Sequence, residues 1–179
     1  MGVPGSIFFI VLFLVRVEQG TRGNWMAWLL CAQSGMAAFR ILFRKESRKD
    51  SIAAVRLLAW LSALAPLSML VAAPSILALP GIVLSLWSLI TLGESFSIAP
   101  SDRGLVAKGP YHIVRHPMYA GELLALIGTC LSNPLLWNWS VLAVFALSIY
   151  VRIIQEESLI AGYGRYTRAV AWRLLPYVW

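Results

Sequence analysis

Hydrophobic residues fall into six long runs that are separated by short polar connections. The runs cover residues 5–17, 25–43, 52–73, 76–93, 117–132 and 134–151. A helix needs about 20 residues, with a range of roughly 17 to 25, to cross the hydrocarbon core of a bilayer. Four of the runs meet that length, the fifth is slightly short, and the first either spans the membrane or lies in its interface. The pattern predicts an all-α, polytopic membrane helical bundle with five to six transmembrane helices.

Basic residues alternate between the connections and so predict an orientation. Lys and Arg gather at 44–50, at 94–116 and in the tail 152–179, whereas the connections 74–80 and 133–138 carry no charge. Because Lys and Arg are enriched on the cytoplasmic side, the three basic segments are expected to share that face. The last two runs form a tight hairpin through Ser132-Asn133-Pro134. We therefore expect an integral multi-pass protein, typical of a bacterial inner membrane, whose polar C-terminal residues meet in the cytoplasm.

Composition supports lipid as the main surroundings of the chain. Of the 179 residues, 59% are hydrophobic and 13% are charged, and the mean hydropathy is +0.74. A soluble domain would carry about a quarter charged residues. The net charge of +7 sits between apolar runs, which favours anionic lipid over nucleic acid. We expect a single membrane domain over 1–179, with N-terminal transmembrane helices over 1–93 and a C-terminal part over 94–179 that holds a loop, a helical hairpin and a cytoplasmic tail.

One candidate constellation lies where the fifth run begins. Pro117 suits the first turn of a helix because its missing N–H would be unpaired there, and His116 would then be at or near the N-cap. Arg115, Tyr119 and Glu122 are spaced i, i+4, i+7 and would share one helix face. Glu122 would lie inside the membrane boundary, where a carboxylate usually faces a partner or a polar cavity. It either belongs to a functional cleft or forms an anchoring pair with Arg115.

A second constellation lies where the sixth run leaves the membrane. Arg152 and Glu156 are i, i+4 neighbours, and Glu157 follows. Considered by themselves, Arg152 and Glu156 would be an ordinary surface ion pair. The topology, however, places them at the same depth in the membrane as the first constellation, and this predicts a cleft between the two. The tail beyond interleaves arginines with aromatic residues, which is typical of headgroup contact or of a cap over the cleft. The chain has no P-loop, no GxGxxG, no GxSxG, and no HExxH or Cys/His cluster, so no metal is expected.

These motifs resemble the isoprenylcysteine carboxyl methyltransferase family, in its small prokaryotic form. The resemblance covers about residues 92–176 and is carried by Leu92–Ser97, Leu105–Tyr111, Val114–Gly121, Glu156-Glu157 and the late Tyr163, Tyr166 and Pro176. Phospholipid N-methyltransferases belong to the same wider superfamily, and membrane sterol reductases share parts of the arrangement.

The resemblance implies a small helical methyltransferase that uses S-adenosylmethionine without a soluble nucleotide-binding domain. The cofactor would bind at the cytoplasmic end, and a hydrophobic or prenylated acceptor would enter from the bilayer. The implied cofactor contacts are Gly109, Pro110, Tyr111, His116, Pro117, Tyr119, Glu156 and Glu157. Arg115 and Arg152 match arginines that hold an anionic group. Glu122 has no counterpart in the eukaryotic enzymes.

The catalytic hypothesis rests on Arg115, Arg152 and Glu122. A carboxylate acceptor is already ionised at neutral pH and needs only positioning by arginine, which favours carboxyl O-methylation of an isoprenylcysteine-like substrate. The alternative is phospholipid N-methylation, in which Glu122 or His116 would act as the base. Hypotheses of other classes are an NADPH-dependent sterol or enone reductase and a non-catalytic membrane scaffold.

Overall fold

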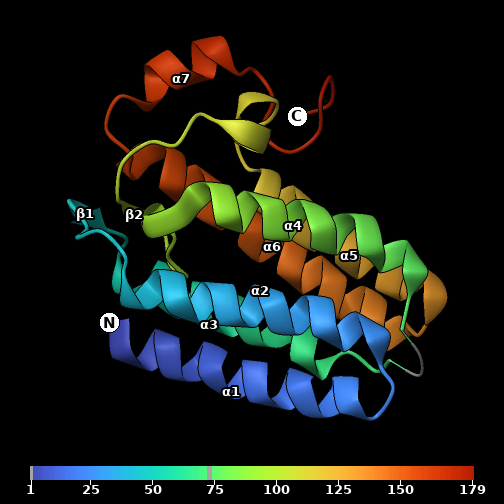
Figure 1. The fold of residues 1–179 in the computed structure, drawn as a ribbon. Coiled ribbons are helices and arrows are strands. Elements are labelled where there is room, and N and C mark those ends of the chain that lie inside the picture. Colours follow the sequence, from blue (N-terminus) through green and yellow to red (C-terminus); the bar gives the residue numbers. More distant parts are fainter. Residues whose placement is uncertain (1, 72–73) are drawn as a thin grey trace.

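A computed structural model describes residues 2–71 and 74–179 and is mostly helical (Figure 1). Its seven α-helices among these residues are α1 (Gly2–Thr21), α2 (Trp25–Leu42), α3 (Ala53–Leu64), α4 (Leu79–Leu92), α5 (Pro117–Ser132), α6 (Leu136–Leu159) and α7 (Tyr163–Ala169). Two strands of two residues each, β1 (Lys49–Asp50) and β2 (Ser101–Asp102), lie in the connections. The prediction of a helical fold is confirmed, and the two strands are an addition to it.

Three of the described helical stretches are long and apolar enough to cross a membrane. They are Pro4–Thr21, Ile76–Ser95 and Leu136–Leu159. The first includes the run at 5–17, the second includes the run at 76–93, and the third begins two residues inside the run at 134–151 and extends beyond it. These stretches mark a membrane protein, whereas a total of five to six spans stays a prediction.

The predicted run 52–73 does not form one long helix. α3 ends at Leu64 and continues as a 3₁₀ turn over Ala65–Ser68, and residues 72–73 lie outside the described residues. Pro66 is the reason, because proline has no N–H for a helical hydrogen bond and its ring clashes with the preceding turn.

Helices α4 and α5 pack backbone against backbone. A Cβ added to Gly81 would lie 2.2 Å from the Ala125 nitrogen, and one added to Gly121 would lie 2.6 Å from the Ser85 nitrogen. Small residues spaced four apart on each helix permit this approach, as is common between membrane helices. The contact fixes α5, which carries the first candidate constellation.

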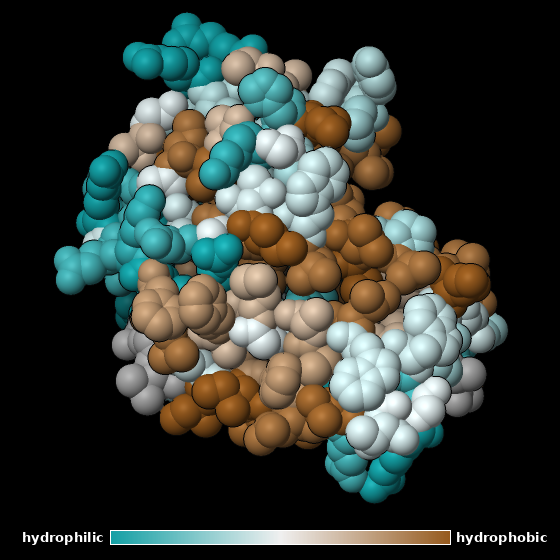
Figure 2. Space-filling model, viewed as in Figure 1, coloured by the Kyte–Doolittle hydropathy of each residue, from teal (hydrophilic) through white to brown (hydrophobic). Residues whose placement is uncertain are grey.

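The connections at one end of the bundle are tied together. β1 and β2 pair antiparallel, with Lys49 opposite Asp102 and Asp50 opposite Ser101. α7 and the tail lie over the same region of the molecule as the start of α5 (Figure 1). Figure 2 shows hydrophilic residues gathered at the end that carries β1, while hydrophobic residues cover the helices beside it. The polar residues of the C-terminal half therefore meet at one end of an otherwise apolar bundle.

Candidate active site

The turn before α5 fixes the backbone of the first constellation. Gly109–His112 forms a 3₁₀ turn, and α5 begins at Pro117 with His116 as its N-cap residue, as the sequence predicts. The residue before a proline is disfavoured in helical conformation, and His116 has φ −128° and ψ 58°. Arg115 therefore precedes the helix and does not share a helix face with Tyr119 and Glu122. This part of the sequence-based interpretation is wrong.

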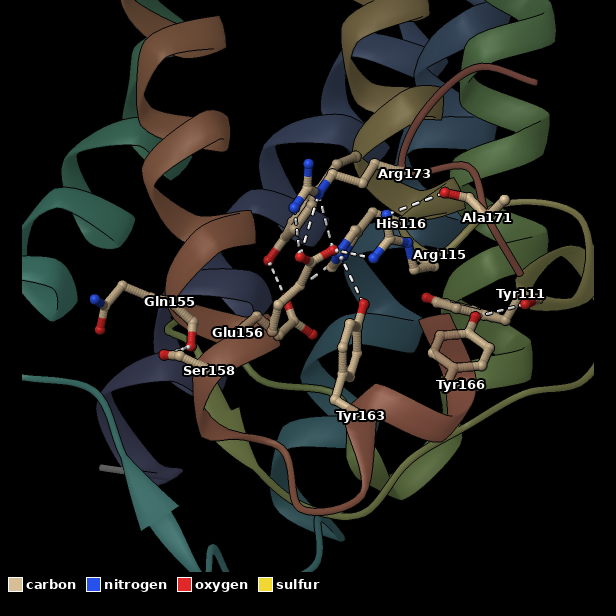
Figure 3. A network of polar contacts seen from close by, with 12 residues as sticks. Tyr111, Arg115, His116, Gln155, Glu156, Ser158, Tyr163, Tyr166, Ala171 and Arg173 are labelled. Atoms are coloured by element: carbon tan, nitrogen blue, oxygen red, sulfur yellow. Dashed lines mark hydrogen bonds and ion pairs between the residues drawn. The ribbon is translucent and has the colours of Figure 1, made fainter. Parts of the chain in front are cut away.

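Glu157 is the centre of an ionic cluster that holds the tail. Its carboxylate accepts from Arg173 Nε at 3.1 Å and Nη2 at 2.9 Å, and it lies 3.1 Å from Arg115 Nη1 and 3.3 Å from His116 Nε2. Figure 3 shows the side chains of Arg115, His116 and Arg173 close to one another in this network. Arg115 pairs with Glu157 and forms no ion pair with Glu122 in the described structure. The alternative of an anchoring pair between Arg115 and Glu122 is therefore wrong.

Backbone bonds complete the attachment of the tail. The N–H groups of Arg115 and His116 donate to the carbonyls of Trp172 and Arg173, each at 2.8 Å, and Arg115 Nη2 donates to the Ala171 carbonyl at 3.1 Å. The tail thus caps the start of α5. The sequence alone did not predict a role for Arg173 in the site, because its position in the tail fits neither a helical nor a strand repeat.

Glu156 lies on the other side of His116. Tyr119 donates its hydroxyl proton to Glu156 Oε2 at 3.0 Å, and the His116 ring stacks on Tyr119 with centroids 5.7 Å apart. Two small cavities, of about 40 and 30 Å³, flank Glu156, and both are lined by Tyr111 and His116. The structure thus brings together four residues predicted to bind the cofactor. Pro110 and Pro117 are buried beside them. Gly109 has φ +56° and lies against the Thr91 side chain.

The tyrosines around this region are held by hydrogen bonds. The Tyr163 hydroxyl lies 3.1 Å from His116 Nε2, and Tyr166 donates to the Tyr111 carbonyl at 2.5 Å. Burial raises the pKa of Tyr166 to about 12, with Arg115 opposing the shift and Glu156 adding to it. Burial and Glu156 also raise the pKa of Tyr111 and of Tyr163 above the ordinary value. These phenols therefore stay protonated at neutral pH.

Arg152 lies at the junction between the polar region and an apolar cavity. Its Nη2 donates to the Ile98 carbonyl at 2.7 Å, and its guanidinium lies 4.7 Å from the Tyr119 ring centroid. Arg152 lines both the 40 Å³ polar cavity and an apolar cavity of about 200 Å³ among the helices. No ion pair joins Arg152 to Glu156 in the described structure, so the expected i, i+4 pair does not form.

Glu122 enters the same apolar cavity from α5. Its Oε2 is buried and has no hydrogen-bond partner among the described residues. The other walls are mostly apolar and come from α1 to α6, with Phe8, Leu12 and Leu126 among them. Such a cavity can hold an apolar chain, and its charged lining consists of the Glu122 carboxylate and the guanidinium groups of Arg16 and Arg152.

Metal ligands do not gather in the part of the chain that the structure describes: it contains no group of three or more His, Cys, Asp or Glu suited to a metal ion. A family model described as phospholipid methyltransferase matches residues 69–165, more than half of the chain. A search of curated proteins finds no match. The matched region includes the start of α5, Arg152 and both glutamates of α6.

Proposed function

Because the chain belongs to the phospholipid methyltransferase family, we propose that it transfers a methyl group from S-adenosylmethionine to a lipid acceptor. Family membership points to a membrane methyltransferase that acts on lipids. The observation that carries the finer proposal is the position of Arg152, which lines both the polar cavity beside Glu156 and the apolar cavity beside Glu122. One molecule on each side of Arg152 would place a methyl donor and an apolar acceptor next to each other.

The residues around Glu156 suit the chemistry of S-adenosylmethionine. The cofactor carries a sulfonium cation, and cations are attracted to carboxylates and to aromatic faces. Glu156, Tyr111 and Tyr119 supply both kinds of group within one small region. The two cavities are far smaller than the roughly 300–1,000 Å³ of ordinary ligand pockets. We therefore propose that the tail beyond Gly162 moves outward when the cofactor binds.

When bound, S-adenosylmethionine supplies an electrophilic methyl group. The protein's part is to position the acceptor and to exclude water. His116 and Tyr119 form a stacked wall beside Glu156, and the tail covers it. Glu157 is fully engaged by Arg115 and Arg173, which supports a positioning role for it in holding that cover.

Two acceptor chemistries are favoured by different side chains. A carboxylate acceptor, as in an isoprenylcysteine-like lipid, fits the guanidinium of Arg152. An amine acceptor, as in a phospholipid headgroup, fits the unpartnered oxygen of Glu122, which can accept a hydrogen bond or a proton. Replacing Glu122 by Gln separates the two: amine methylation should fall by about 10²-fold or more, whereas carboxylate methylation should persist.

The site is proposed to face the cytoplasm of a bacterial cell. The three basic segments of the chain meet at one end of the bundle, because β1 pairs with β2 and the tail bonds to residues 115–116. This supports the expectation that all three lie on the Lys- and Arg-rich cytoplasmic side.

A radiometric assay tests the function directly. Purified protein in mixed micelles is given methyl-labelled S-adenosylmethionine with either an isoprenylcysteine analogue or phosphatidylethanolamine. Label should enter one lipid, and Glu156→Ala should abolish the transfer. Glu18→Gln is the matched control, because this exposed carboxylate pairs only with Arg22 at the end of α1 in the described structure. No transfer to any lipid extract, with the protein folded, would contradict the proposal.

A further inference from the structure

A further polar cavity lies next to the candidate active site. It has a volume of about 420 Å³ and is enclosed by the α2–α3 connection, the α4–α5 connection and the start of α1. Six charged side chains line it: Arg44, Lys45, Glu46, Asp50, Arg56 and Arg103. Four are cations and two are anions, so the cavity has an excess of positive charge.

The basic side chains of this cavity are not neutralised by ion pairs. None of the six forms a salt bridge within the described residues, although several other arginines of the chain do. Arg103 donates from Nη1 to the Lys45 carbonyl, while its buried Nε has no hydrogen-bond partner in the described structure. Burial and the neighbouring Arg44 lower the pKa of Arg103, and Asp50 only partly opposes them. An anion in the cavity would relieve this repulsion.

Backbone hydrogen bonds within the chain hold the walls of the cavity. The N–H of Ser51 donates to the Pro100 carbonyl at 3.1 Å, and that of Arg48 donates to the Asp102 carbonyl at 2.8 Å. These bonds flank the paired strands β1 and β2 and join the two connections that carry the arginines. Because the site is already ordered, a ligand would lose little affinity to the ordering of loops.

Part of the cavity lining is apolar. Trp60 and the buried side chains of Ile41 and Ile98 contribute to it, and Ile98 also lines the apolar cavity of the candidate active site. The hydrophilic end of the bundle in Figure 2 carries this region, beside the hydrophobic surface of the helices. Basic side chains together with buried apolar side chains in one cavity suit a molecule with an anionic head and an apolar body, at the depth of lipid headgroups.

We propose that this cavity binds the phosphate group of an anionic membrane lipid, at a site separate from the one for methyl transfer. Its described lining includes none of Glu122, His116 and Glu156. The small cavity beside Glu156 shares Ser97, Ala99 and Ser101 with this site, so the bound lipid would lie next to the site for methyl transfer without entering it.

The test compares lipid binding by matched pairs of arginine variants. Short-chain phosphatidylglycerol is titrated into the full chain in detergent, and binding is followed by native mass spectrometry and by the melting temperature. The variant Arg44→Gln/Arg103→Gln removes two charges from the cavity, and Arg165→Gln/Arg168→Gln removes two exposed charges from α7. At about five-fold per arginine, the first pair should weaken binding by about 25-fold and the second by less than two-fold.

Other ligands separate the remaining explanations. Phosphatidylcholine, which has no net charge, should stabilise the two double variants equally. Inorganic phosphate or NADPH could instead stabilise the protein as much as phosphatidylglycerol does. If Arg44→Gln/Arg103→Gln also abolished that stabilisation, the proposal would be overturned in favour of a soluble phosphate compound. Equal weakening of phosphatidylglycerol binding in the two pairs would overturn it in favour of general surface charge.

Two controls keep the result interpretable. If the double variant does not fold, Arg44→Gln alone tests the site, because its side chain makes no hydrogen bond that would be lost in the described structure. S-adenosylhomocysteine should still stabilise Arg44→Gln. If Arg44→Gln loses phosphatidylglycerol binding but is still stabilised by S-adenosylhomocysteine, the change affects the lipid site alone. The proposed lipid site and the proposed methyltransferase function can therefore be refuted separately.

Discussion

The glycine contact between α4 and α5 predicts that a single methyl group will disturb the candidate active site. In Gly121→Ala the new Cβ would lie 2.6 Å from the Ser85 nitrogen and 2.7 Å from the Gly81 carbonyl oxygen. Both neighbours are backbone atoms, so no side chain can rotate away. The helices must separate until these distances reach the 3.4 Å at which ordinary contact begins.

The structure gives the size of the effect. Overpacking of this kind costs about 2 kcal/mol, which corresponds to a fall of roughly 4–8 °C in melting temperature for a chain of this length. Tyr119 and Glu122 are on the same turns of α5 as Gly121 and would move with it. A displacement of about 1 Å in a positioning group can reduce turnover by about 10²-fold.

The matched control is Gly164→Ala in α7. A Cβ there meets no atom within 4 Å, so the same chemical change should leave stability equal or slightly raised. Thermal unfolding in detergent and the methyl-transfer assay measure both variants. Equal melting temperatures for the two variants would refute the close backbone contact and its role in fixing α5.

Three further predictions concern the polar contacts that hold the bundle and its cap. Asn138→Ala should lower stability by about 2 kcal/mol in thermal unfolding, because the buried amide of Asn138 pairs with both backbone groups of one loop residue. Tyr166 has its pKa raised to about 12, so its contribution to stability should be complete below pH 10 and decline as the pH rises toward 12. Melting curves from pH 7 to 11 should show a smaller loss of stability with rising pH in Tyr166→Phe than in the unchanged protein. Glu157→Gln should speed tryptic cleavage of the tail about ten-fold through loss of its bonds to Arg173, whereas Glu156→Gln should not.

Local signals predicted the framework of the site. Pro117 marked the start of α5 with His116 at its N-cap, and the turn at 132–134 separates α5 from α6 as expected. These features depend on the covalent properties of proline and on hydrophobic run length, which are visible in sequence. The meeting of Tyr119 with Glu156 followed from the topology of the hairpin.

The partners of the arginines were not predictable in the same way. Arg152 bonds the carbonyl of Ile98, and Arg115 pairs with Glu157, because loops distant in sequence fold against them. Helical spacing compares only residues on one helix and therefore favoured pairs that do not form. The unpartnered oxygen of Glu122 and the cavity lined by Arg44 and Arg103 likewise depend on how separate connections pack.

Binding of S-adenosylhomocysteine tests the central claim most directly. The melting temperature of the detergent-purified protein is measured with S-adenosylhomocysteine and with NADPH, since a ligand that binds only the folded state raises it. The account predicts stabilisation by S-adenosylhomocysteine alone, which Glu156→Ala and His116→Ala abolish and Glu18→Gln retains. Stabilisation by NADPH alone, or a response to S-adenosylhomocysteine that survives in Glu156→Ala and His116→Ala, would contradict it.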